Sequence, residues 1–155
     1  MTAIDFYTRV ADRLQIAARL VAKAFAQHGR VRVLTPDAAA TDALDRMLWM
    51  QPAIAFLPHC RLDSRLALET PIWVDHALEH TGPAVVLINL HDAPPPFFST
   101  FERLAEIAGL DEAHVASARE RYRFYRERGY PLRTHDLSER IRWRLLASFW
   151  HRPMR

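Results

Sequence analysis

The fold is decided near the start of the chain, where residues 3–34 read AIDFYTRVADRLQIAARLVAKAFAQHGRVRVL. Residues 3–7 form a short apolar and aromatic run that is typical of a strand. In residues 12–27 the apolar side chains recur at helical spacing, and Gly29 can supply the C-cap of that helix. Residues 31–34 predict a second strand. A strand, a helix and a second strand in this order favour a parallel sheet in which the helix makes the crossover.

The alternation of strands and helices continues along the chain. Residues 38–50 predict a second helix, and short apolar runs predict strands at 54–57, 72–74 and 84–90. The run at 84–90 is apolar except at Asn89, as expected for a central strand that is buried on both faces. Together these elements predict a single-domain α/β fold with a largely parallel sheet flanked by helices.

The next part of the chain mixes a clear loop, an ambiguous segment and a clear helix. Three successive prolines place residues 93–98 in a loop. Residues 101–108 fit either a helix or a short strand that ends at Gly109, and single-sequence reasoning leaves both alternatives open. A long helix then begins at Asp111, a good N-cap residue, and Gly129 stands just beyond its end.

Length and pattern together predict the domain organisation. A chain of 155 residues suits one domain with a core of its own. Residues 136–151 nevertheless have the pattern of an additional basic amphipathic helix. We therefore expect an α/β domain over residues 1–136 and a basic helical extension over residues 137–155.

The composition argues against an exported or membrane protein. Cys60 is the only cysteine, so no internal disulfide or cysteine-rich zinc site can form, and a reducing compartment such as the cytoplasm is expected. Residues 1–10 lack the basic and apolar regions of a signal peptide. No apolar run approaches the ~20 residues that a membrane span requires, so we expect no membrane partner.

A search for catalytic or cofactor chemistry finds little. The four glycines are too scattered to form a phosphate-binding loop, and the eight histidines form no zinc-ligand motif, so we expect neither a cofactor nor a metal. One enzymatic alternative depends on Asp92, which follows the strand at 84–90 at a place where parallel-sheet proteins often hold catalytic acids. That alternative predicts a deep polar pocket beside Asp92.

The helix at residues 111–128 reads DEAHVASARERYRFYRER and carries the most information about function. At about 100° per residue, its apolar side chains form one stripe, made of Val115, Ala118, Tyr122 and Tyr125. Three arginines border that stripe, namely Arg119, Arg123 and Arg126. Guanidinium groups beside an aromatic floor suit an acidic peptide with a large apolar side chain, and they suit single-stranded nucleic acid as well. A net charge of only +3 does not decide between these partners or exclude a helix that is merely solvated.

A second aromatic cluster lies within residues 48–59, which read LWMQPAIAFLPH. Trp49 and Phe56, followed by Pro58, are either core residues or parts of an exposed patch. An exposed patch of this kind is typical of protein interfaces, where aromatic side chains dominate the binding energy.

Four stretches of this sequence are characteristic in combination. They are IDFY at 4–7, LWMQPAIAFLPH at 48–59, VVLINL at 85–90 and ARERYRFYRERGYPL at 118–132. Together they resemble the chi subunit family of bacterial DNA polymerase III over roughly residues 3–136. The resemblance implies a non-catalytic α/β fold of the mononucleotide-binding type that has no nucleotide site.

The resemblance also implies two partners. The family tethers the clamp-loader assembly to single-stranded-DNA-binding protein by gripping the acidic C-terminal tail of that protein, so contact with nucleic acid is indirect. By matching positions, the tail-binding residues would be Arg119, Tyr122, Arg123 and Arg126, with the arginines meeting carboxylates and Tyr122 helping to floor a pocket for the terminal phenylalanine. The residues expected to dock the psi subunit or another clamp-loader component are Trp49, Phe56 and Pro58.

Overall fold

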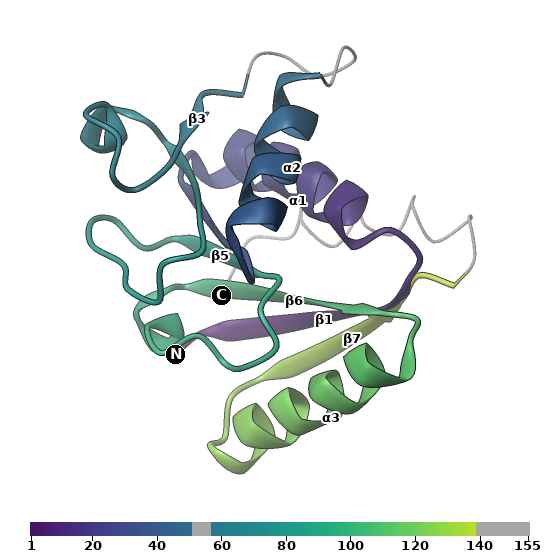
Figure 1. Ribbon diagram of the computed structural model, residues 1–155. Helices are drawn as coiled ribbons and strands as arrows, with labels where there is room; N and C mark the ends of the chain where they lie inside the picture. The colour runs from purple at the N-terminus through teal and green to yellow at the C-terminus, as the bar shows by residue number, and fades with distance from the viewer. Residues whose placement is uncertain (51–56, 139–155) are drawn as a thin grey trace.

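The computed structural model describes residues 1–50 and 57–138, and over these residues the chain forms one parallel sheet with helices on both faces (Figure 1). In chain order the strands are β1 (Ala3–Val10), β2 (Val31–Leu34), β3 (His59–Cys60), β4 (Ile72–Asp75), β5 (Val86–Asn89), β6 (Arg103–Gly109) and β7 (Leu132–Asp136). The α-helices are α1 (Arg13–His28), α2 (Ala38–Trp49) and α3 (Glu112–Glu127). The predicted α/β class and parallel sheet are confirmed.

The order of the strands shows where the chain changes direction across the sheet. The order is β3-β4-β2-β5-β6-β1-β7, and each neighbouring pair is parallel. From β1 the chain crosses through α1 to β2, whereas from β6 it crosses through α3 to β7 on the other side of β1. Open parallel sheets place their ligand crevice at such a switch point, beyond the carboxyl ends of the strands. In this chain the switch point lies between β1 and β6.

Two hydrophobic cores form, one on each face of the sheet. On one face α1 and α2 contribute Leu20 and Leu44 to a core that also includes Val33 of β2. On the other face α3 packs Tyr125 against Phe6 of β1. Because helices cover both faces, all four residues of β2 and all four of β5 are buried, which explains why these strands are mainly apolar, with Arg32 and Asn89 as the exceptions.

The predicted ends of the long helices agree with the structure. Gly29 adopts a left-handed conformation at φ 78° after α1, and Gly129 does so at φ 79° just after α3. Glycine is favoured there because it has no Cβ to clash in that conformation. Asp111 is the N-cap residue of α3, but its carboxylate contacts Nδ1 of His114 at 2.5 Å and makes no capping hydrogen bond.

Several expectations are corrected by the structure. The ambiguous segment 101–108 is mainly strand, since β6 covers Arg103–Gly109. Strand β7 has no counterpart in the sequence prediction, and Asp136, expected to begin a C-terminal helix, is the last residue of β7. Most of the strand expected at 54–57 and of the extension expected at 137–155 lies outside the described residues. The strand that follows α2 in the described residues is β3.

Candidate functional site

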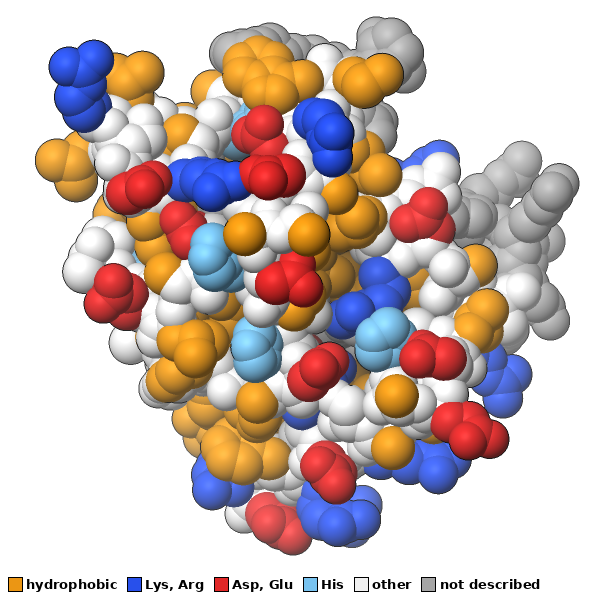
Figure 2. Space-filling model, viewed as in Figure 1, with side chains coloured by type: hydrophobic (Ala, Val, Ile, Leu, Met, Phe, Trp, Pro, Cys, Tyr) orange, Lys and Arg blue, Asp and Glu red, His pale blue; other side chains and the backbone are white. Residues whose placement is uncertain are grey.

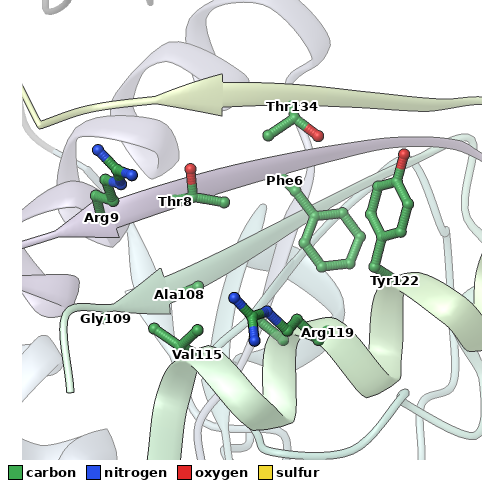
Figure 3. A pocket seen from close by; sticks show the side chains of 10 residues that line it. Phe6, Thr8, Arg9, Ala108, Gly109, Val115, Arg119, Tyr122 and Thr134 are labelled. Carbon is green, nitrogen blue, oxygen red and sulfur yellow. The ribbon is translucent and has the colours of Figure 1, made fainter. Parts of the chain in front are cut away.

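A groove opens between α3 and the sheet, at the switch point between β1 and β6 (Figure 3). Its volume is about 180 Å³. The apolar lining comes from strands and helix together and consists of Phe6, Ala108, Val115 and Ala118. We call this cavity the α3 groove. An apolar cavity of about 150 Å³ is large enough for a benzene molecule, so the α3 groove has room for one aromatic side chain.

Polar and amphipathic side chains surround this apolar floor. Tyr122 is half-buried, and its ring meets the ring of Phe6 edge to face, with centroids 5.3 Å apart. Arg119 lies one turn earlier on α3 and is exposed. Arg9, Thr8 and Thr134 contribute from β1 and β7 on the side of the groove that faces α3. The α3 groove thus combines an aromatic wall with two guanidinium groups.

Five arginines lie between positions 119 and 128, four on α3 and one, Arg128, at its C-cap. They fall into two classes. Arg119, Arg123 and Arg126 are exposed, and no hydrogen bond or ion pair to another described residue engages their guanidinium groups. In contrast, Arg121 is only 3% exposed, and Arg128 stacks its guanidinium 3.5 Å from the ring centre of Phe124. Only the three arginines predicted for ligand binding are therefore available, and of these Arg119 lines the α3 groove.

A buried polar network fixes α3 on the sheet. Glu106 of β6 is fully buried, and its Oε1 accepts hydrogen bonds from Nε of Arg121 at 3.1 Å and from the amide of Asn89 at 2.9 Å. The Tyr125 hydroxyl donates to Oε2 at 2.5 Å. Each of these groups would be costly to bury alone, and together they satisfy one another. The network sets the height of α3 above the sheet and so the depth of the α3 groove.

Burial dominates the electrostatics of this network. Loss of hydration raises the pKa of the Glu106 carboxyl above its usual range, while the charge of Arg121 acts in the opposite direction. Burial, with the carboxylate of Glu106 nearby, also raises the pKa of Tyr125. The Tyr125 hydroxyl is therefore a permanent hydrogen-bond donor near neutral pH.

Among the described residues, the polar groups around Asp92 at the carboxyl end of β5 are engaged with α3 and with the buried network. Asp92 is exposed, and its backbone carbonyl accepts hydrogen bonds from Arg121 at 3.2 Å and from Ser117 at 2.8 Å. The side chain of Asn89, at the end of β5, points into the buried network. The Asp92 carbonyl therefore joins the loop after β5 to α3, and the Asn89 side chain joins β5 to the network around Glu106.

Over residues 1–50 and 57–138, no group of three or more histidine, cysteine, aspartate or glutamate side chains is arranged to hold a metal ion. Among the same residues no helix has the length and apolar character needed to cross a membrane.

The two predicted docking residues that the structure describes, Trp49 and Pro58, do not line the α3 groove. Trp49 ends α2 and is 58% exposed, and its ring rests on the ring of His59 with centroids 4.7 Å apart. Pro58 is half-buried, and Phe56 lies outside the described residues. Figure 1 shows α2, which ends at Trp49, and α3 on opposite sides of the sheet, so Trp49 and Arg119 belong to different faces. In Figure 2 the surface around the end of α2 carries exposed hydrophobic side chains.

Sequence reasoning missed half of the α3 groove. Helix spacing placed Arg119 and Tyr122 on one face and the family resemblance implied their role, but neither gave a role to Phe6, Arg9 or Thr134. The alternation of β1 places Phe6 and Thr8 on one face, which is a signal that could have been used. Thr134 belongs to β7, and without that strand its place beside the groove could not be anticipated.

Comparisons with known proteins place the chain in a family. Residues 1–133 match the family model described as DNA polymerase III chi subunit, HolC. The chain is 38% identical to DNA polymerase III subunit chi of Pseudomonas aeruginosa over 141 residues, which cover 88% of this chain and 98% of that protein. Identity to the Haemophilus influenzae subunit chi is 27%, covering 80% of this chain and 87% of the relative, and identity to the Escherichia coli subunit is 25%, covering 77% and 82%.

The fold and the groove define a parallel α/β domain with a ligand crevice but no phosphate-binding loop. The chain belongs to the DNA polymerase III chi subunit family. It is thus a non-catalytic accessory subunit of the DNA polymerase III holoenzyme, and its partners include other components of that holoenzyme.

Proposed function

We propose that the chain links the polymerase III clamp-loader complex to single-stranded-DNA-binding protein by binding the acidic C-terminal tail of that protein in the α3 groove. One observation carries the proposal: Arg119 and Tyr122, assigned from the sequence, line the same apolar groove on the surface. As a replication subunit of this kind, the chain would act in the cytoplasm.

The contacts of the α3 groove support an acidic peptide that ends in an aromatic residue. The apolar floor around Phe6 and Ala118 can bury one ring, and Tyr122 offers an edge-to-face contact to it. Arg119 stands beside this floor, while Arg123 and Arg126 continue along α3 beyond it. Guanidinium groups bind carboxylates through paired hydrogen bonds, so a row of arginines suits several acidic residues in series.

Binding of a synthetic acidic peptide with a C-terminal phenylalanine, measured by isothermal titration calorimetry, tests the proposal. Arg119→Glu should weaken binding by at least about tenfold, or ~1.4 kcal/mol, since a charge next to the peptide carboxylates changes sign. Arg65→Glu is the matched control because Arg65 is also exposed and lies in the loop before β4, outside the groove. Equal affinities of wild type and Arg119→Glu would reject the assigned site.

A parallel titration with a single-stranded oligonucleotide addresses the rival function. A direct nucleic-acid binder would use the same arginines for phosphates and Tyr122 for stacking. Tight binding of the oligonucleotide by the isolated chain at moderate salt, with no binding of the peptide, would favour that rival over the tail-binding proposal.

We propose a second interface around Trp49, Phe56 and Pro58, which docks the psi subunit or another clamp-loader component. The exposed indole at the end of α2 is the supporting observation, since exposed tryptophans are frequent anchors of protein interfaces. Trp49→Ala should abolish capture of the clamp-loader partner and leave peptide affinity unchanged, while Arg119→Glu should have the reverse effect. Loss of both activities in either variant would contradict two separate faces.

A further inference from the structure

Arg9 has an unusual backbone conformation beside the α3 groove. Its φ of 57° makes it the one non-glycine residue with a positive φ among residues 1–50 and 57–138. Side chains with a Cβ are disfavoured there, and arginine has no local hydrogen bond of the kind that helps asparagine. Residues in such conformations persist only where the surrounding structure holds them, and they cluster at functional sites.

A β-bulge accounts for this conformation. Strand β1 pairs with β6 in constant register from Ala3 opposite Arg103 to Tyr7 opposite Ile107, but Val10 then lies opposite Gly109. Strand β1 therefore holds one residue more than β6 between these points. A bulge of this kind turns a side chain away from its regular direction. Here it brings Arg9 to the lining of the α3 groove (Figure 3).

The guanidinium of Arg9 retains donors for a ligand. Its Nη1 lies 3.6 Å from Oδ2 of Asp136, and the side chain is 65% exposed. An ion pair of this length and exposure contributes little to stability. Because a guanidinium has five N–H donors in a planar fork, Arg9 can bind a second carboxylate or exchange Asp136 for it.

The size of the α3 groove indicates which carboxylate of a ligand Arg9 can bind. The cavity has room for one large apolar side chain. When that side chain fills the floor, the main chain of the same residue lies at the mouth, between Arg9 on β1 and Arg119 on α3. If the residue is the last of its chain, the mouth receives a terminal carboxylate attached to the same Cα. Two guanidinium forks from opposite walls can then share this one group.

We propose that Arg9 is a specificity-determining residue of the α3 groove, which clamps the terminal carboxylate of an apolar-ended peptide together with Arg119. This inference rests on the proposed tail binding and adds a requirement for a free chain end. Asp136 holds Arg9 in the free protein and is displaced when the peptide binds. The downstream arginines Arg123 and Arg126 remain for acidic side chains that precede the last residue.

The test combines two peptides with two matched variants. The peptides are the acidic, phenylalanine-ended sequence with a free terminal carboxylate and the same sequence with a terminal amide. Arg9→Asn removes the charge, and asparagine tolerates the left-handed backbone, so the bulge is kept. Arg133→Asn is the control because Arg133 is exposed on β7 and, by strand alternation, faces away from the groove-lining Thr134.

We expect Arg9→Asn to weaken the free-acid peptide about five- to tenfold and the amidated peptide less than twofold, whereas Arg133→Asn leaves both affinities within twofold of wild type. Asp136→Asn, which frees Arg9 of its resting partner, should bind the free-acid peptide more tightly than wild type does. Two results would overturn the inference. In the first, Arg9→Asn weakens the affinity for both peptides equally; in the second, Arg9→Asn binds the free-acid peptide with wild-type affinity.

The design separates this inference from the proposed function. If wild type binds the peptide and Arg119→Glu does not, while Arg9→Asn binds normally, the tail-binding proposal stands and the clamp is wrong. If wild type binds neither peptide, the tail-binding proposal itself fails and the clamp fails with it.

Discussion

Replacing Tyr125 by phenylalanine isolates one hydrogen bond of the buried network under α3. The Tyr125 hydroxyl donates to Oε2 of Glu106 at 2.5 Å, and the Tyr125 side chain is fully buried. Without the hydroxyl, Oε2 keeps only the amide of Asn89, at 3.1 Å. A hydrogen bond to a charged group contributes about 1.5–3 kcal/mol, so the free energy of unfolding should fall by roughly that amount in Tyr125→Phe.

Chemical and thermal unfolding followed by circular dichroism measure this loss. For a chain of this size each kcal/mol corresponds to about 2–4 °C in Tm, so Tm should fall by roughly 3–12 °C. Tyr122→Phe is the matched control because Tyr122 lies on the same helix but makes no hydrogen bond with another described residue through its hydroxyl. The control should stay within about 0.5 kcal/mol of wild type. If both variants unfold alike, Glu106 does not hold α3 on the sheet in the way described.

Three further predictions concern other parts of the chain. Asp12→Ala removes the N-cap of α1, whose carboxylate accepts from the Gln15 amide at 3.1 Å, and should destabilise the fold by about 1 kcal/mol in urea titration, with no change in peptide affinity. Burial lowers the pKa of His80, so the unfolded chain takes up a proton there more readily than the folded chain, and the free energy of unfolding should fall as pH drops below about 6.5. In His80→Gln this part of the pH dependence should disappear from the unfolding curves. A pH dependence equal to that of wild type in His80→Gln would contradict this prediction. Peptide affinity should decrease when salt rises from about 0.1 to 1 M, which shortens the screening length from ~10 to ~3 Å, and Arg119→Gln should show a weaker salt dependence than wild type in the same titration.

Much of the fold followed from the sequence because its central elements are locally consistent. The strands β2 and β5 are mainly apolar, with Arg32 and Asn89 as the exceptions, and α1 has both a regular apolar period and glycine at its end. Because each of these residue patterns fits one kind of secondary structure, the hydrophobic periodicity was sufficient to predict these strands and this helix. The same holds for α3, where helix geometry separated Arg119 from the buried Arg121.

The elements that sequence reasoning missed depend on distant partners. Strand β7 reads LRTHD, which has no strong strand pattern, and it forms because β1 offers its edge from more than a hundred residues away. Strand β6 was ambiguous because its apolar residues also fit helical spacing. Its Glu106 can be buried because Arg121 and Tyr125 reach it from α3 and Asn89 reaches it from β5. Arg9 enters the groove through a bulge, which the sequence of β1 does not reveal.

A crystal structure of the chain with the acidic, phenylalanine-ended peptide tests the central claim most directly. We expect the terminal ring inside the α3 groove, in contact with Phe6 and Tyr122, and a peptide carboxylate within hydrogen-bonding distance of Arg119. A peptide bound elsewhere, for example against Trp49, with the α3 groove empty, would contradict it.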